Sequence, residues 1–152
     1  MSNLAIGLNA NGVLTSPDLH DGSLVGMVLA ANGDLSLFCR AVDAKLYKLV
    51  VPAVERMRAD NFLQGNTIFE ISVYEGEDCP RKALEDLYCY TNEAREHLYS
   101  RNDNLMGTWI PAQLEKITRE GWTLISLGSS YGCELLALSR LPAERITISE
   151  VF

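Results

Sequence analysis

The sequence predicts an α+β fold in which an antiparallel sheet of about five to seven strands carries two helices packed on one face. Three observations predict it: short apolar runs separated by turn residues, an amphipathic segment in the middle of the chain, and strand-like runs after that segment. Helices grouped between two sets of strands argue against repeating βαβ units. The 152 residues fit a single domain. Its parts are an irregular lead-in at 1–22, a β-rich half at 23–74, a helical segment at 79–120 and C-terminal strands at 122–152.

The first strands follow from local pattern. The runs Ser23–Ala31 and Leu35–Val42 flank an Asn-Gly-Asp turn, and Asn-Gly takes the positive φ angles of a tight hairpin. Leu46–Val51 is rich in β-branched and aromatic residues, which favours a third antiparallel strand. Residues 53–59 fit either a fourth strand or a helical turn. Thr67–Tyr74 alternates between two faces and predicts a further strand.

The middle of the chain predicts two helices. From Cys79 to about Ser100, apolar residues recur at helical spacing, with Asp78 as a suitable N-cap. A second, shorter helix is expected from Pro111 to Glu120, because proline is tolerated in a first turn. Strands are expected again at the C-terminus. The predicted core residues are Leu37, Cys39, Leu49, Phe69, Ile71, Leu84, Leu87, Leu114, Ile117, Leu124 and Leu136.

Composition excludes several classes of protein. Twenty acidic against thirteen basic residues give a net charge of -7, which repels phosphate groups, so neither nucleic acid nor an anionic membrane is an expected partner. No apolar run approaches the length of a membrane span, and the N-terminus lacks the features of a signal peptide. A cytoplasmic protein with reduced thiols is expected. The four cysteines show no metal-ligand spacing, and no cofactor or metal is expected.

Acidic residues gather between Arg58 and Arg81, where no lysine or arginine occurs. This uneven distribution suggests a docking surface for a basic protein. A plainer interpretation is that most of these acids favour the positive end of the helix that follows. The residues of the candidate docking surface are Glu70, Glu75, Glu77 and Asp78.

Asp18, His20 and Asp21 form a second candidate, a metal or acid/base cluster. A metal site needs three or four ligands, and the other histidine of the chain, His97, is far away in sequence. The structural interpretation is a turn in which Asp21 and Gly22 lead into the first long strand.

Gly128 to Gly132 matches the pattern G-x-S-x-G. If residues 133–141 form a helix, this segment resembles the nucleophile elbow of the α/β-hydrolase family, and the resemblance makes Ser130 the nucleophile. In that family the acid and the histidine follow the serine, whereas here the base would have to be His20 or His97, both upstream. The alternative is a hairpin in which Ser130 is a turn residue and the following strand is apolar on both faces.

Three functions fit these observations. The preferred one is a non-enzymatic cytosolic binding protein, such as an acidic inhibitor or an immunity-type partner of a basic protein, because no catalytic set is assembled. The second is a small serine hydrolase that uses Ser130. The third is a structural domain that self-associates, for example as a homodimer, through an exposed edge strand.

Overall fold

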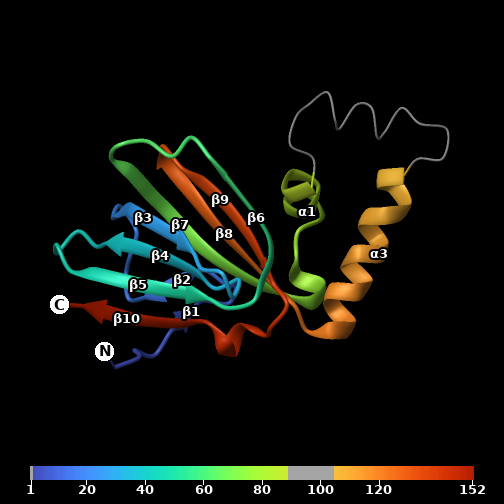
Figure 1. The fold of residues 1–152 in the computed structure, drawn as a ribbon, viewed down its shortest axis with the longest axis horizontal. Helices are drawn as coiled ribbons and strands as arrows, with labels where there is room; N and C mark the ends of the chain where they lie inside the picture. The colour runs from blue at the N-terminus through green and yellow to red at the C-terminus, as the bar shows by residue number, and fades with distance from the viewer. Residues whose placement is uncertain (1, 89–104) are drawn as a thin grey trace.

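The computed structural model describes residues 2–88 and 105–152. Within these residues, eight antiparallel strands form one sheet in the order β10-β5-β4-β3-β7-β8-β9-β6, and β1 and β2 pair separately. The α+β fold is therefore confirmed, with one strand more than expected in the large sheet (Figure 1). The strands are β1 Gly7–Leu8, β2 Leu14–Ser16, β3 Ser23–Leu29, β4 Leu35–Arg40, β5 Leu46–Val51, β6 Val54–Asp60, β7 Asn66–Glu75, β8 Thr123–Tyr131, β9 Glu134–Ser139 and β10 Thr147–Val151. The helices are α1 Arg81–Tyr88 and α3 Leu105–Glu120, with 3-10 turns η1 Gly76–Asp78 and η2 Ala143–Arg145.

The large sheet consists of two four-stranded halves rolled over one core. The central neighbours β3 and β7 pair only where Ser23 and Leu24 face Thr67 and Asn66. Two residues separate β5 from β6, although these strands belong to different halves of the sheet. The outer parts of the sheet must therefore approach each other at this connection. There the N–H of Val54 in β6 donates a hydrogen bond of 2.8 Å to the carbonyl of Gly33, which lies in the turn before β4. This bond joins the two halves.

Two groups of buried side chains hold the fold together. The inner group lies between the halves and includes Leu37 and Leu49 from one half and Ile71 and Leu127 from the other. The outer group lies between the helices and the outer face of β8 and β9, to one side of the sheet in Figure 1. Burying each such side chain contributes about 2 kcal/mol. The outer group consists of Cys79, Leu84, Leu87, Ile110, Ile117, Trp122, Leu124 and Leu138.

The sequence left open whether residues 53–59 form a strand or a helical turn. They form most of strand β6, which pairs with β9. Its outward-facing Arg56 and Arg58 donate hydrogen bonds of 3.1 and 2.6 Å to the carbonyls of Leu87 and Asp86, near the end of α1. Carbonyls at a helix C-terminus carry partial negative charge, so these cations stabilise α1 in its place. Neither α1 nor α3 is long and apolar enough to cross a membrane.

One predicted core residue is wrong. Phe69 is 51% exposed, whereas its neighbour Ile68 is fully buried. The pairing of β7 with β8 shifts register on both sides of Ile68, and such a bulge changes which side chains face the core. Strict alternation along the strand therefore fails at this point. Leu114 and Leu136 pack on the outer group but are only partly buried.

Both predicted helix starts also need correction. The carbonyl of Pro80 accepts the N–H groups of Ala83 and Leu84, so α1 begins after Pro80 and Asp78 does not cap it. Pro111 lies inside α3, which begins at Leu105. Burial of Ile110 in the outer group favours a helix through this region despite the lost proline N–H. The expected remainder of the first helix, from Cys89 to Ser100, lies outside the described residues.

Candidate functional site

The G-x-S-x-G motif lies on a hairpin. β8 pairs antiparallel with β9, and Leu127 faces Leu135 next to the turn. Gly128 to Tyr131 are the last residues of β8, and β9 follows two residues after them. The hairpin is therefore confirmed, and strand β9 stands where an elbow requires a helix, but Ser130 belongs to β8 and not to the turn. Ser130 is exposed at the end of β8.

The local backbone geometry explains why the second glycine of the motif, Gly132, is a glycine. Gly132 has a φ of +91°, and a Cβ added there would lie 2.4 Å from Oδ1 of Asn66. The side chain of Asn66 is 2% exposed, and its Oδ1 accepts the N–H of Cys133 at 3.0 Å. Only glycine combines this backbone angle with so close an approach to a buried amide.

Replacing Gly132 by alanine is expected to lower the free energy of unfolding by about 2 kcal/mol, because the left-handed backbone and the contact with Asn66 both disfavour a side chain. The matched control is Gly65→Ala, whose φ is +84° but whose Cβ would meet nothing within 4 Å. That variant should lose about 1 kcal/mol. Urea unfolding measures both, and equal losses would contradict the packing reason.

His20 belongs to a turn. Its backbone N–H donates to Oδ1 of Asp18 at 3.0 Å, and its Nδ1 lies 3.2 Å from Oδ2 of Asp21. The N–H of Gly22 closes the turn on the carbonyl of Leu19. These contacts are local hydrogen bonds of the kind that Asp makes in turns.

The structure does not bring His20 and Ser130 together. The N–H of Asp21 donates to the carbonyl of Ile68 at one edge of β7, while β8, which contains Ser130, pairs with the other edge. The backbones near His20 and Ser130 are therefore separated by two spacings between neighbouring strands, about 10 Å. The ring of His20 instead contacts Phe69, with 5.5 Å between the ring centroids. His97, the other candidate base, lies outside the described residues.

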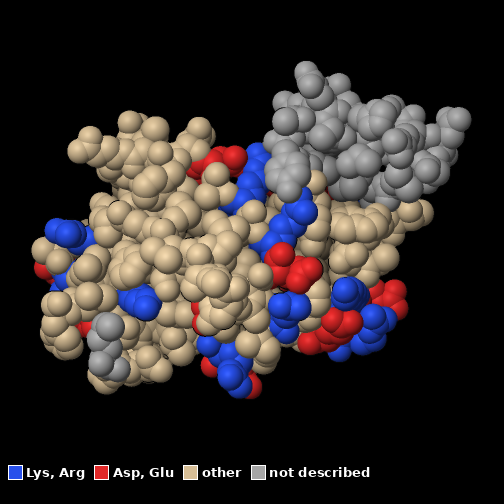
Figure 2. All heavy atoms as spheres, viewed as in Figure 1, with Lys and Arg blue, Asp and Glu red and all other residues tan. Residues whose placement is uncertain are grey.

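The four acidic residues of the candidate docking surface are divided along β7. Glu75 ends this strand and is followed by Glu77 and Asp78 in η1. Glu70 lies five residues earlier on the same strand, a distance of about 17 Å. Figure 2 shows acidic and basic side chains intermixed on the face it presents, beside a wide uncharged area. A single acidic docking surface stays a prediction.

The buried thiols are poor nucleophiles. Burial raises the pKa of Cys39 to about 12 and that of Cys79 to about 11. Burial, and then the nearby carboxylates of Asp60 and Glu134, also raise the pKa of Cys133. The thiolate is the reactive form, so all three remain neutral near pH 7. Cys39, a predicted core residue, and Cys133 both lie in the inner group.

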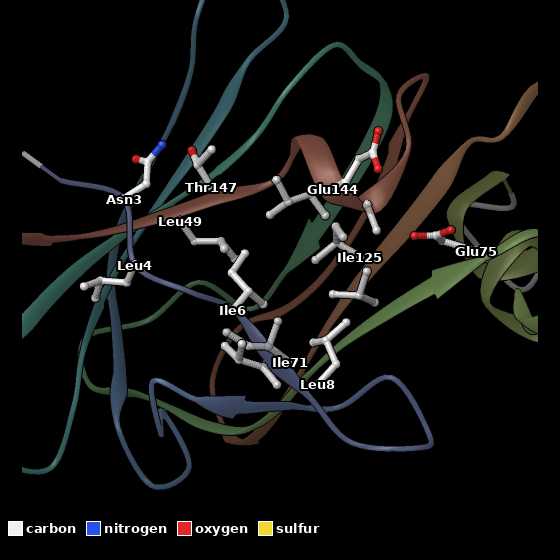
Figure 3. A pocket seen from close by; sticks show the side chains of 14 residues that line it. Asn3, Leu4, Ile6, Leu8, Leu49, Ile71, Glu75, Ile125, Glu144 and Thr147 are labelled. Carbon is white, nitrogen blue, oxygen red and sulfur yellow. The ribbon is translucent and has the colours of Figure 1, made fainter.

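An apolar pocket of about 490 Å³ opens on the inner face of the sheet. Its roof is a segment that we call the N-terminal strap, residues 3–14, which crosses from one half of the sheet to the other. At one end Leu4 N–H donates to the carbonyl of Ile148 in β10, and at the other Val73 N–H in β7 donates to the carbonyl of Gly12, both at 2.8 Å. Between these anchors the strap spans the core without joining the large sheet (Figure 3).

The walls of this pocket are aliphatic. Leu4, Ile6 and Leu8 of the strap face it from one side, and core side chains such as Ile71 and Ile125 form the other (Figure 3). Four polar side chains also line it: Asn3, Glu75, Glu144 and Thr147. A second hollow of about 780 Å³ lies beside His20, but its walls are mostly the turns around Asp18 and Asp43.

Sequence reasoning missed this pocket, because residues 1–22 were expected to be an irregular lead-in. The signal that could have revealed it is the alternation of Leu4, Ile6 and Leu8, which puts three aliphatic side chains on one face of an extended segment. No family model, curated protein or solved structure matches this chain.

Proposed function

We propose that this is a non-enzymatic binding protein that takes a small molecule with an apolar body into the pocket beneath the N-terminal strap. The observation that carries the proposal is the pocket itself, about 490 Å³ bounded by aliphatic side chains of the strap and the inner core. Ligand sites in proteins are mostly apolar hollows of about 300–1,000 Å³ with few polar groups. Leu4 and Leu8 of the strap are 38% and 42% exposed, so an occupant would cover apolar surface that otherwise faces water.

The composition of the walls supports binding over catalysis. Among the described residues that line the pocket there is no serine, cysteine, histidine or lysine, the side chains that most often supply a nucleophile. Ser130 lies outside the pocket, near the other end of β8 from Ile125. The hypothesis of a serine hydrolase therefore draws no support from this site.

The neutral fluorescent probe N-phenyl-1-naphthylamine tests the proposal. We expect saturable binding of one probe per chain, with a blue-shifted emission. A ligand at 100 times its Kd stabilises the folded state by about 2.7 kcal/mol, so the Tm should rise by about 5–10 °C.

A pocket-filling variant sharpens this test. Ala143 lines the pocket from η2, so Ala143→Phe should weaken probe binding at least about tenfold by occupying the space. The matched control is Ala112→Phe, because Ala112 is exposed on α3 and does not line the pocket. Equal probe affinity in the two variants, with both folded by circular dichroism, would refute binding in this pocket.

Two expectations from the sequence stay predictions. The first is a basic protein as partner, which rests on the net charge of -7. The second is a homodimer formed through a sheet edge. At the edge strand β10 part of the free backbone is already used, because Leu4 bonds to Ile148 and Asn3 bridges to Ser149. This pairing favours a binding function over self-association at that edge.

A further inference from the structure

We propose that the ligand of the pocket carries a cationic group, an amine or guanidinium joined to an aliphatic chain, and that Glu75 and Glu144 hold it. This inference rests on the proposed function. It starts from the charged side chains on the pocket wall, which are these two glutamates, while the other polar wall residues are the neutral Asn3 and Thr147. No described lysine or arginine lines the pocket.

The two carboxylates lie at the same end of the pocket. Glu75 ends β7, and Glu144 belongs to η2, which packs against β7. Figure 3 shows both carboxylates on one side of the pocket, with Asn3 and Leu4 toward the opposite side. The aliphatic side chains of Ile71 and Ile125 lie between the two ends. The site therefore has an acidic end and an apolar body.

Within the described residues, neither carboxylate has an ion-pair partner. Some other exposed acidic groups are paired, for example Glu55 with Arg140 at 3.4 Å and Asp43 with Lys45 at 3.6 Å. Arg145 is the residue next to Glu144, but it does not line the pocket. Two carboxylates at one end of a pocket attract a cation and disfavour an anion there.

The charge and the shape together define the ligand class. An ammonium group that binds at Glu75 and Glu144 replaces its hydrogen bonds to water with charge-assisted hydrogen bonds to the carboxylates. Its alkyl chain then lies along the aliphatic wall. A carboxylate in the same position would face two negative charges. Alkyl chains of one length with opposite head groups should therefore differ in affinity.

Competition against N-phenyl-1-naphthylamine measures this difference with octylammonium, octan-1-ol and octanoate. We expect octylammonium to bind at least about tenfold more tightly than octanoate, with octan-1-ol between them. The preference should fall as salt is added, since salt screens charges at an exposed end of the pocket.

Glutamine variants test whether Glu75 and Glu144 cause the preference for octylammonium over octanoate. The double variant Glu75→Gln and Glu144→Gln should bind octylammonium and octanoate within about threefold of each other, with octan-1-ol unchanged. The matched control is Glu77→Gln, because Glu77 is an exposed neighbour in η1 that does not line the pocket. The control should keep the full preference for octylammonium.

The outcomes separate the two proposals. If the neutral probe binds but octylammonium and octanoate compete equally, the cationic ligand is refuted and the pocket function stands. If neither the probe nor any octyl compound binds, both proposals fail together. Binding of a lysine-rich peptide without binding of octylammonium would also overturn the inference, in favour of a basic protein as the occupant.

Discussion

Replacing Asn66 by aspartate is expected to lower the free energy of unfolding by about 4 kcal/mol at pH 7. The side chain is 2% exposed and uses all of its hydrogen-bonding capacity. Its Nδ2 donates to the carbonyls of Leu24 and Leu63, and its Oδ1 accepts the N–H groups of Leu63 and Cys133. One amide thereby joins β3, the loop before β7 and the β8–β9 turn.

Aspartate would turn two of these four hydrogen bonds into repulsive contacts. Its oxygens can still accept from the two N–H groups, but a charged oxygen would face the carbonyls of Leu24 and Leu63 in a buried site. Burial of an uncompensated charge raises the pKa of such a carboxyl above its value in the unfolded chain. The charge penalty is therefore absent well below pH 4, where both states are protonated, and grows as the pH rises above that. A smaller loss remains at low pH, because a protonated carboxyl can donate to only one of the two carbonyls.

Urea unfolding at pH 7 and at low pH checks this result, each time as the difference from the unsubstituted protein. Asn66→Ala should also destabilise, by about 3 kcal/mol at any pH, because it leaves buried polar groups without partners. The matched control is Asn61→Asp, an exposed position in the same loop, which should be nearly neutral. A loss at Asn66→Asp that does not change with pH would contradict the buried-charge explanation.

Replacing Gly12 by alanine is expected to cost about 3 kcal/mol and to detach the N-terminal strap from β7. Gly12 has a φ of +77°, and a Cβ there would lie 2.3 Å from the carbonyl oxygen of Val73. That carbonyl belongs to a sheet strand and cannot move aside as a flexible side chain could. The hydrogen bond from Val73 N–H to the Gly12 carbonyl would be lost with the contact.

Detachment of the strap should affect the pocket as well as stability. Leu4, Ile6 and Leu8 would no longer cover it, so binding of the neutral probe should weaken at least about tenfold. Gly121→Ala is the control, since its φ is +67° but nothing lies within 4 Å of its Cβ. Hydrogen exchange should show faster exchange at Leu4 and Val73 in Gly12→Ala alone. An unchanged exchange rate at both amides would refute the role of Gly12 as an anchor.

Local patterns in the sequence predicted most elements correctly, because they act over a few residues. The Asn-Gly turn between β3 and β4 and the stripe of α1 with Leu84 and Leu87 are examples. The G-x-S-x-G motif shows the limit of such patterns. Residues 134–139 form a strand that pairs with β6 as well as with β8, and β6 lies more than seventy residues earlier in the chain.

The wrong predictions share that cause. Phe69 faces solvent because a bulge formed with β8, a strand more than fifty residues further along the chain, shifts the register around Ile68. Pro111 is inside a helix because tertiary packing of Ile110 outweighs a local preference of proline. Long-range contacts decided both positions.

The sequence by itself determined the α+β class, the antiparallel pairing of neighbouring strands and much of the core, because apolar periodicity and turn residues specify these locally. Only the tertiary structure decided that the sheet rolls into two halves, that Asn66 joins three segments, and that Leu4, Ile6 and Leu8 close a pocket over Ile71 and Ile125. The physical reason is that a pocket is a gap between segments distant in sequence. Its existence depends on how those segments pack, and each segment alone looks like an ordinary apolar run.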